Sequence, residues 1–277
     1  MSYAAPEPRH VASRDGTPIA VFSSGDGPPL ILVHGTTADH TTWRATGPEL
    51  DRGYRIHAVD RRGRGASGDG GGRYSIDLEY DDLAAVADAV AGEAEMPVDV
   101  VGHSYGGRVG LGAALRTASI GRLVVYEGAP SPADGRGYLP SGVEDRMATL
   151  IEAGDRDAAL QAFFREIVRM PEEELAAYRA NPVWPVRVAA VHTSLREIEA
   201  EGSPAASMKA LGGVAIPVLQ VLGTASAAPF GEAVRGLDAR LPNGRVVVIE
   251  GARHAAHHTH VGEFVAAIRA FLEDVPD

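Results

Sequence analysis

The chain has 277 residues, which is enough for one large α/β domain that buries a full hydrophobic core. Hydrophobic residues make up 45% of the chain and charged residues 23%, and these proportions exclude a mainly disordered, collagen-like or coiled-coil protein. The net charge of −11 disfavours a general binder of nucleic acid or of an anionic membrane, and the absence of cysteine excludes disulfides, cysteine-ligated metals and a cysteine nucleophile.

The N-terminal segment, M-S-Y-A-A-P-E-P-R-H, carries no recognisable targeting signal. It lacks the apolar stretch that a secretory signal requires. No apolar run in the chain approaches the ~18 residues that a membrane-spanning helix needs. We therefore expect a cytoplasmic protein that does not bind membranes or nucleic acid.

Short runs rich in β-branched residues predict the strands of a largely parallel sheet. Their apolar character is nearly continuous, which indicates strands buried on both faces. An earlier pair of segments flanks the turn sequence R-D-G-T-P and predicts an antiparallel hairpin. The hairpin segments lie near residues 11–13 and 19–23, and the buried runs are residues 30–34, 55–60, 98–102, 123–127, 218–222 and 246–250.

Segments with helical periodicity separate these strands. The clearest are residues 77–90, 105–117 and 261–272. Strands that alternate with helices predict βαβ units and an α/β fold. The alternation stops in residues 131–213, which show helical periodicity and no convincing strand. We expect a helical cap there, inserted between the sixth and seventh strands of a core made of residues 1–130 and 214–277.

The sequence V-V-G-H-S-Y-G-G contains a G-x-S-x-G motif centred on Ser104. It lies where a predicted strand meets a helix of small residues, and a nucleophile elbow requires this context. The flanking glycines let the backbone approach closely around a sharp turn, and the helix N-terminus points N–H groups at developing negative charge. We interpret Ser104 as a catalytic nucleophile.

With the sequence L-V-H-G-T-T at residues 32–37, this motif resembles the α/β-hydrolase family. The resemblance covers residues 15–130 and 214–273 and includes a D-R-R-G-R-G-x-S tract at residues 60–67, which is structural in that family. It implies an α/β-hydrolase fold, with a mostly parallel eight-stranded sheet, helices on both faces and a helical cap.

The same resemblance implies further catalytic groups. The backbone N–H groups of Thr36 and Tyr105 would form the oxyanion hole. The family places its catalytic histidine between the last strand and the last helix, which corresponds to His254 in I-E-G-A-R-H. We interpret His34 as a brace for the loop after the first buried strand, without a chemical role of its own.

The position of the triad acid departs from the commonest family pattern. That pattern places an aspartate just past the strand at residues 218–222, but the stretch G-T-A-S-A-A-P-F offers only Ala225 or Ser226 there. Some branches of the family, including zearalenone lactonases, carry a glutamate at the end of the preceding strand, and the matching residue is Glu127. We predict that the Glu127 carboxylate contacts His254; a solvated charge at Glu127 is the alternative, and Glu232 is a second candidate acid.

A cluster of histidines near the C-terminus raises the alternative of a metal site. The cluster consists of His254, His257, His258 and His260. No acidic ligand motif accompanies it, so we predict neither a metal nor a cofactor. We interpret the last three of these histidines as solvated or helix-capping residues.

A glycine pattern after the strand at residues 55–60 raises a second alternative. Gly63, Gly65 and Gly68 satisfy G-x-G-x-x-G, which is typical of dinucleotide sites. Such a site needs the loop to open a helix, and here the loop runs into G-D-G-G-G. A dehydrogenase is therefore disfavoured.

These patterns predict a cofactor-free serine hydrolase with a Ser-His-Glu triad. Aromatic residues of the cap favour a lipophilic small-molecule substrate, which is an ester, lactone or thioester. The N-P-V-W stretch resembles a cap tract of hydrolases that open the lactone zearalenone, so we expect Trp184 near the cleft as a substrate-binding residue. The alternative is a non-hydrolytic protein of the same fold, a lyase or a ligand-binding protein. The sequence leaves the oligomeric state open.

Overall fold

The computed structural model describes residues 7–131 and 139–274. Within these ranges, eight strands form one sheet in the order β1-β2-β4-β3-β5-β6-β7-β8. The first two pairs along this order are antiparallel and the other five are parallel, as the sequence predicts. The strands are β1 (Arg9–Ala12), β2 (Pro18–Ser24), β3 (Pro29–Val33), β4 (Arg55–Val59), β5 (Val98–His103), β6 (Ile120–Tyr126), β7 (Val218–Gly223) and β8 (Gly244–Ile249).

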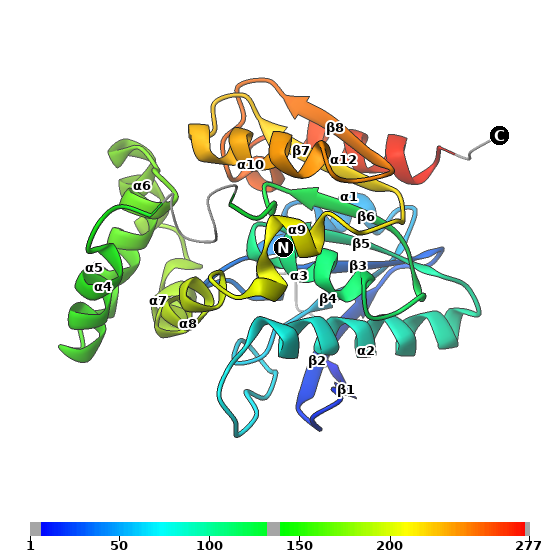
Figure 1. Cartoon of the computed structure of the whole chain (residues 1–277), viewed down its shortest axis with the longest axis horizontal. Coiled ribbons are helices and arrows are strands. Elements are labelled where there is room, and N and C mark those ends of the chain that lie inside the picture. The colour runs from blue at the N-terminus through cyan, green and yellow to red at the C-terminus, as the bar shows by residue number, and fades with distance from the viewer. Residues whose placement is uncertain (1–6, 132–138, 275–277) are drawn as a thin grey trace.

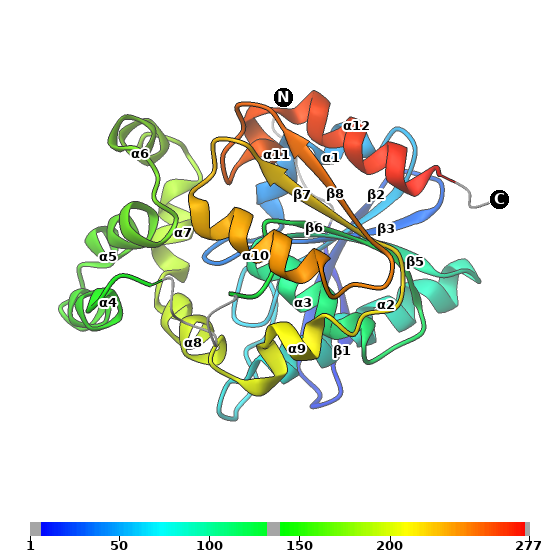
Figure 2. The ribbon, with the colours of Figure 1, turned by 45° about the horizontal axis from the view of Figure 1, so that its top comes forward.

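Helices cover both faces of the sheet (Figures 1 and 2). The core helices are η1 (His40–Arg44), α1 (Gly47–Leu50), α2 (Ile76–Ala94), α3 (Tyr105–Ala114), α10 (Ala228–Asp238), α11 (Ala256–Thr259) and α12 (Val261–Leu272). The helices between β6 and β7 are α4 (Val143–Glu152), α5 (Arg156–Ala162), η2 (Phe163–Ile167), α6 (Glu172–Arg179), α7 (Trp184–Ala190), α8 (His192–Ala200), η3 (Pro204–Ala206) and α9 (Met208–Leu211). None of the described helices is long and apolar enough to cross a membrane.

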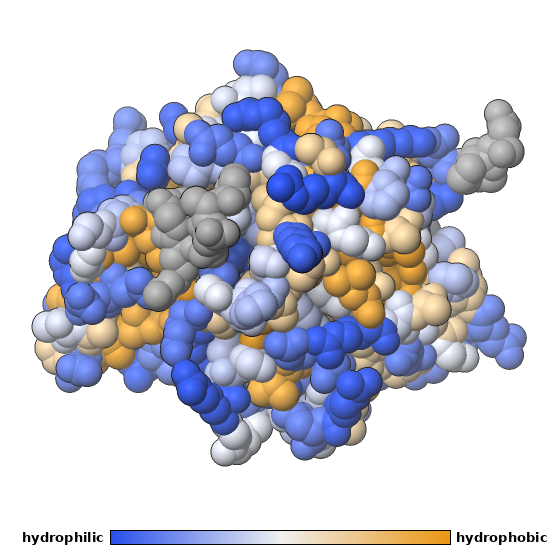
Figure 3. Space-filling model, viewed as in Figure 1, coloured by the Kyte–Doolittle hydropathy of each residue, from blue (hydrophilic) through white to orange (hydrophobic). Residues whose placement is uncertain are grey.

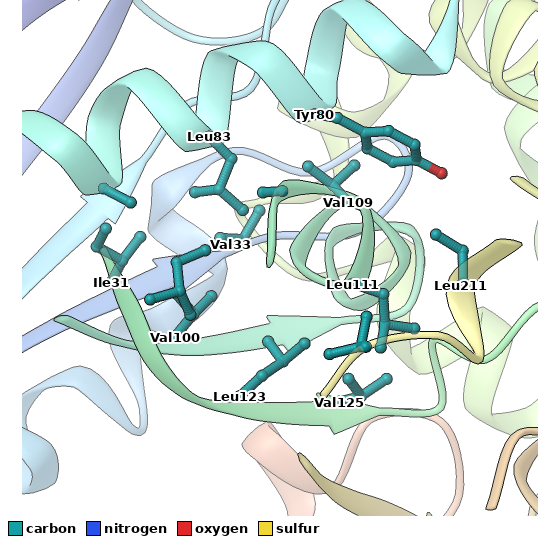
Figure 4. Packing of buried hydrophobic residues seen from close by; sticks show 14 of the residues in the cluster. Ile31, Val33, Tyr80, Leu83, Val100, Val109, Leu111, Leu123, Val125 and Leu211 are labelled. Atoms are coloured by element: carbon teal, nitrogen blue, oxygen red, sulfur yellow. The ribbon is translucent and has the colours of Figure 1, made fainter. Parts of the chain in front are cut away.

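Alternate residues of the central strands supply two separate hydrophobic cores. In β3, Ile31 faces a core that contains residues of α2 and α3, while Leu32 faces a core that contains residues of α1 and α12. Figure 4 shows the first of these cores, where Leu83 of α2 and Val109 of α3 lie over Val100 of β5. Successive side chains of a strand point to opposite faces, so an all-apolar strand fits a sheet covered on both sides.

Strand β8 departs from the burial that its sequence predicts. Val246, Val247 and Val248 are 40%, 38% and 56% exposed. These valines are exposed because β8 is the last strand of the sheet and pairs only with β7. Elsewhere on the face shown in Figure 3, hydrophilic residues cover most of the surface and leave small apolar patches between them.

The helices α4 to α8, which fall in the range predicted as a cap, lie together at one side of the sheet (left in Figure 1). This cap has a hydrophobic cluster of its own, which includes Met147, Phe163 and Trp184. Met208 and Leu211 of α9 lie within the range predicted as a cap, residues 131–213, and pack in the same core as α2 and α3. The last turns of the insertion therefore belong to the core by packing.

Candidate active site

Ser104 lies on a sharp turn between β5 and α3. Its backbone has φ 53° and ψ −124°, a conformation that residues with a side chain rarely adopt. Two glycines make this turn feasible. A Cβ atom at Gly106 would lie 2.4 Å from the carbonyl oxygens of Val33 and His34, and one at Gly102 would lie 2.5 Å from the Gly106 oxygen. The motif therefore folds as the predicted elbow and presents the serine at the N-terminus of α3.

The loop after β3 lies beside this elbow, as a Cβ atom added at Gly35 would lie 3.0 Å from the Ser104 Cβ. Thr36 of this loop and Tyr105 line a common cavity with Ser104. Neither amide N–H donates a hydrogen bond to an atom of the described residues, so both are free to bind a developing oxyanion.

His34 braces this loop, as the sequence predicts. It is fully buried, its Nε2 accepts a hydrogen bond from the Arg61 amide at 3.0 Å, and its Nδ1 contacts the Gly35 oxygen at 2.8 Å. Since Nε2 accepts, the ring proton lies on Nδ1. Burial and the nearby Arg61 guanidinium hold the pKa of His34 well below its usual value, so the ring is a neutral structural link.

Glu127 follows β6 and meets His254, as the sequence predicts. The His254 Nδ1 lies 2.6 Å from Glu127 Oε2. The other oxygen, Oε1, accepts hydrogen bonds from the Gly223 amide at 2.8 Å and from the Ser226 hydroxyl at 2.6 Å. Glu127 is only 4% exposed, so the alternative of a solvated strand-end charge is wrong. These contacts hold the carboxylate in one orientation toward the imidazole.

His254 is fixed by other contacts as well. Its backbone oxygen lies 2.8 Å from His103 Nε2, and its ring stacks on Phe230 with a centroid distance of 4.4 Å. Tyr126 donates a hydrogen bond to the oxygen of the preceding residue, Arg253. Among the described residues no hydrogen bond joins the Ser104 hydroxyl to His254. Catalytic contacts of this kind often tighten only when substrate binds.

Two cavities share a wall that contains Thr36, Ser104 and His254. The first cavity has a volume of about 300 Å³, and the second has a volume of about 380 Å³. The first cavity is also lined by Tyr105, Phe163, Ile167, Phe230 and the ion pair of Arg108 with Glu201. The second is also lined by Phe164, Met170, Tyr178 and several arginines. The cap supplies part of the wall of both, so a substrate at Ser104 has room on two sides.

The structure does not place Trp184 on the wall of either cavity, and the expectation of a direct substrate contact is not supported. Its indole Nε1 donates a hydrogen bond to Asp157 at 2.6 Å, and its ring packs against Phe164 and Tyr178. Both of these aromatic residues line the second cavity. Trp184 therefore lies in the cap core, one layer behind that wall.

The interpretation of the later histidines is wrong for His257. It is 1% exposed and contacts the rings of Trp43 and His103. Burial lowers the pKa of His257 well below its usual value, and burial with the nearby Arg44 lowers the pKa of His258 to about 3. Within the described residues, no group of three or more histidine or acidic side chains is arranged to hold a metal ion.

The structure also shows where His260 and Glu232 lie, the two remaining residues that the sequence analysis considered. His260 lies at the junction of α11 and α12, a capping position, and Glu232 is an exposed residue of α10 on the wall of the first cavity. No hydrogen bond joins Glu232 to His254 among the described residues, so the structure favours Glu127 as the partner.

Two residues at the site were missed by sequence reasoning. A signal for Ser226 was available, because the family resemblance places the usual acid near Ala225 or Ser226. Arg187 of α7 lines the second cavity and carried no signal, because nothing in the sequence separates it from the other arginines of the cap.

The chain is similar to known proteins over most of its length. A model of the alpha/beta hydrolase family matches residues 30–268. The chain is 28% identical over 258 residues to a pimeloyl-acyl-carrier-protein methyl ester esterase of Neisseria meningitidis, covering 90% of this chain and 78% of that protein.

The fold is also similar to the folds of solved structures. An alpha/beta hydrolase from Sphaerobacter thermophilus superposes with a TM-score of 0.79 and 31% identity, covering 94% of this chain and 100% of that one. The esterase RhEst1 from Rhodococcus superposes with a TM-score of 0.76 and 24% identity, covering 98% of this chain and 100% of that one. The match of the family model over most of the chain, together with the elbow and the sheet described above, shows that this chain belongs to the alpha/beta hydrolase family.

Proposed function

We propose that the chain is a serine hydrolase that cleaves a carboxylic ester bond, with Ser104 as nucleophile, His254 as general base and acid, and Glu127 as triad acid. The observation that carries this proposal is the contact of 2.6 Å between the buried Glu127 carboxylate and His254, next to a serine on a strained elbow. A carboxylate on Nδ1 holds the imidazole in the tautomer that leaves Nε2 free to accept a proton.

The reaction follows from these positions. The Ser104 hydroxyl attacks the ester carbonyl carbon while His254 Nε2 takes its proton. The tetrahedral oxyanion accepts hydrogen bonds from the Thr36 and Tyr105 amides. His254 then protonates the leaving alcohol, and an acyl-enzyme remains on Ser104. Water attacks the acyl group, His254 takes the water's proton and returns it to Ser104, and the acid is released.

The substrate class is proposed from the cavity walls. Apolar residues such as Phe163, Ile167 and Phe230 line the first cavity, which suits the hydrocarbon part of a small ester, lactone or thioester. The names of the similar proteins, among them an esterase and a methyl ester esterase, support ester cleavage.

A panel of esters and lactones of graded acyl size, assayed with the wild-type protein and with Ser104→Ala, tests this function. We expect turnover of at least one ester by the wild type and a loss of about 10³-fold or more in the variant, because removal of the nucleophile leaves only binding and oxyanion stabilisation. Near-wild-type turnover by a folded Ser104→Ala protein would contradict the mechanism. No turnover of any substrate by the wild type would favour the non-hydrolytic alternative.

A further inference from the structure

The second cavity carries an excess of positive charge. Four arginines line it, namely Arg44, Arg169, Arg187 and Arg253, while Glu174 is its one acidic residue among those the structure describes. Glu174 lies 3.1 Å from Arg253 and neutralises that arginine. The net charge of this wall is therefore opposite in sign to the net charge of −11 for the whole chain.

Arg187 is the most buried of these arginines, at 8% exposed. Its guanidinium donates hydrogen bonds to the Thr36 oxygen at 3.3 Å, to the Thr37 hydroxyl at 3.2 Å and to the Thr42 hydroxyl at 3.5 Å. All three acceptors are neutral, and all three contacts are long for hydrogen bonds of a charged donor. In the described part of the chain, no carboxylate lies within ion-pair distance of Arg187.

The first cavity is different in this respect. Its Arg108 is paired with Glu201 at 2.6 Å, and its Glu197 forms ion pairs with Arg61 and Arg64. Every buried charge of these residues has a partner of opposite sign. Among the described residues, the buried guanidinium without an ion-pair partner thus lines the second cavity only, whereas Arg169, which lines both cavities, is exposed.

Arg187 also lies over the rings of Phe164 and Tyr178, with its Cζ 5.7 Å and 5.5 Å from their centroids. These contacts and the three long hydrogen bonds to neutral oxygens compensate only part of the hydration that a buried guanidinium loses, and a ligand that supplies a counterion would compensate more. We propose that Arg187 binds a carboxylate group of the substrate in the second cavity, so that the protein acts on esters that carry a free carboxylate. This inference rests on the proposed function, because it assigns the substrate class of the same site. The planar fork of a guanidinium matches the two oxygens of a carboxylate.

The contact with Thr36 fixes where that carboxylate lies. Thr36 offers its N–H to the oxyanion and its carbonyl oxygen to Arg187. The guanidinium therefore contacts the same residue that supplies one of the proposed oxyanion donors. A carboxylate bound there is separated from the ester carbon by only a few bonds, which favours half-esters of short dicarboxylic acids.

Arg187 also joins the cap to the loop after β3, so a purely structural role is the rival explanation. A structural role would change the turnover of charged and neutral substrates by the same factor. The experiment therefore compares matched pairs. Monomethyl and dimethyl esters of succinate, glutarate and adipate vary the charge in the acyl part, and acetoxyacetate with its methyl ester varies it in the alcohol part.

The variants are Arg187→Met and Arg187→Lys, with Arg146→Met as the control. Arg146 is an exposed cap residue that pairs with Glu166 and lines neither cavity. In Arg187→Met we expect KM to rise about 10- to 100-fold more for the charged member of at least one pair than for its neutral member, the size expected for a lost charge-assisted contact. Arg187→Lys keeps the charge without the fork and should restore part of this difference, while Arg146→Met should show none.

A second readout is inhibition of neutral-ester turnover by adipate and by its neutral diamide. Adipate should compete in the wild type, the diamide should not, and Arg187→Lys should weaken the competition. Equal factors for both members of every pair, or no competition by adipate in the wild type, would overturn the inference. Turnover of neither member of any pair by the wild type would instead contradict the proposed function.

Discussion

Glu127 directly follows β6, and the stretch after β7 where the family resemblance places the acid holds Ala225 and Ser226. The two strands are parallel neighbours, and the Glu127 amide donates a hydrogen bond to Val221 of β7 at 3.1 Å. The ends of these strands therefore meet at one edge of the sheet. Glu127 reaches from the end of β6 to His254, and the Ser226 hydroxyl donates a hydrogen bond to its carboxylate.

Replacement of Glu127 by glutamine tests whether Glu127 acts as the triad acid. Glu127→Gln keeps the size of the side chain but cannot stabilise the imidazolium or impose the correct tautomer on His254. We expect kcat to fall by about 10⁴-fold, as when the acid of a triad becomes an amide, with an unchanged circular dichroism spectrum. The matched control is Glu232→Gln, at an exposed acid on the wall of the first cavity, which should change kcat little. A fully active Glu127→Gln protein would exclude Glu127 from the triad.

At the residue scale, local motifs revealed only part of the site. Ser104 was recognisable because its turn has a sequence signature, and His254 because the family resemblance implies a catalytic histidine between the last strand and the last helix. Glu127 was recognisable through a family resemblance and through the missing carboxylate after β7. The burial of His257 and the unpaired charge of Arg187 were not, because both arise from side chains that α7, η1 and α11 bring together only in the folded protein.

At the scale of elements, Trp184 at the start of α7 connects three other helices of the predicted cap. It packs against Phe164 at the start of η2 and against Tyr178 of α6, and it bonds to Asp157 of α5. We expect Trp184→Ala to lower the free energy of unfolding by about 3–5 kcal/mol, the usual cost of removing a buried large aromatic side chain. Denaturant titration measures this loss, and Trp184→Phe, which loses mainly the indole N–H, is the milder control. Unchanged stability in Trp184→Ala would show that the cap does not depend on this packing.

Periodicity in the sequence predicts most elements but not how the cap ends. The helices from α4 to α8 lie within residues 131–213, where periodicity predicts helices and no strand. The switch to a π-helical turn at η2 and the packing of α9 on the core have no local signal, because both depend on neighbours that are distant in sequence. The sequence also predicted burial for the exposed valines of β8, because it does not reveal that β8 is the last strand of the sheet.

At the scale of the whole molecule, a buried ion network fastens the cap to the core. Arg61 and Arg64, from the tract after β4, both pair with Glu197 of α8, and Arg61 also pairs with Glu79 of α2. All four side chains are almost completely buried. The charges within this network balance, whereas Arg187 has no ion-pair partner among the described residues. The tract at residues 60–67 therefore has the structural role that the family resemblance implies.

The pH dependence of the free energy of unfolding tests the effect of burial on Asp99, an acidic residue of β5. Burial raises the pKa of Asp99 in β5 from its usual value of 3.8 to about 6. Because the folded pKa is the higher one, the protonated form favours folding; that contribution is complete below about pH 4 and is lost as the pH rises through 6. Asp99→Asn should therefore raise the free energy of unfolding at pH 7 by on the order of 2 kcal/mol and give little gain at pH 4. Equal effects at both pH values, measured by denaturant titration, would contradict this assignment.

The central claim is that Ser104 is a nucleophile activated by His254 and Glu127, and covalent labelling tests it most directly. A fluorophosphonate reacts with an activated serine and adds one phosphonyl group, which intact-protein mass spectrometry detects. The account predicts a single addition to the wild type, located at Ser104 by peptide mapping, no addition to Ser104→Ala and slow addition to Glu127→Gln. An unlabelled wild-type protein that is folded, or a label on another residue, would contradict it.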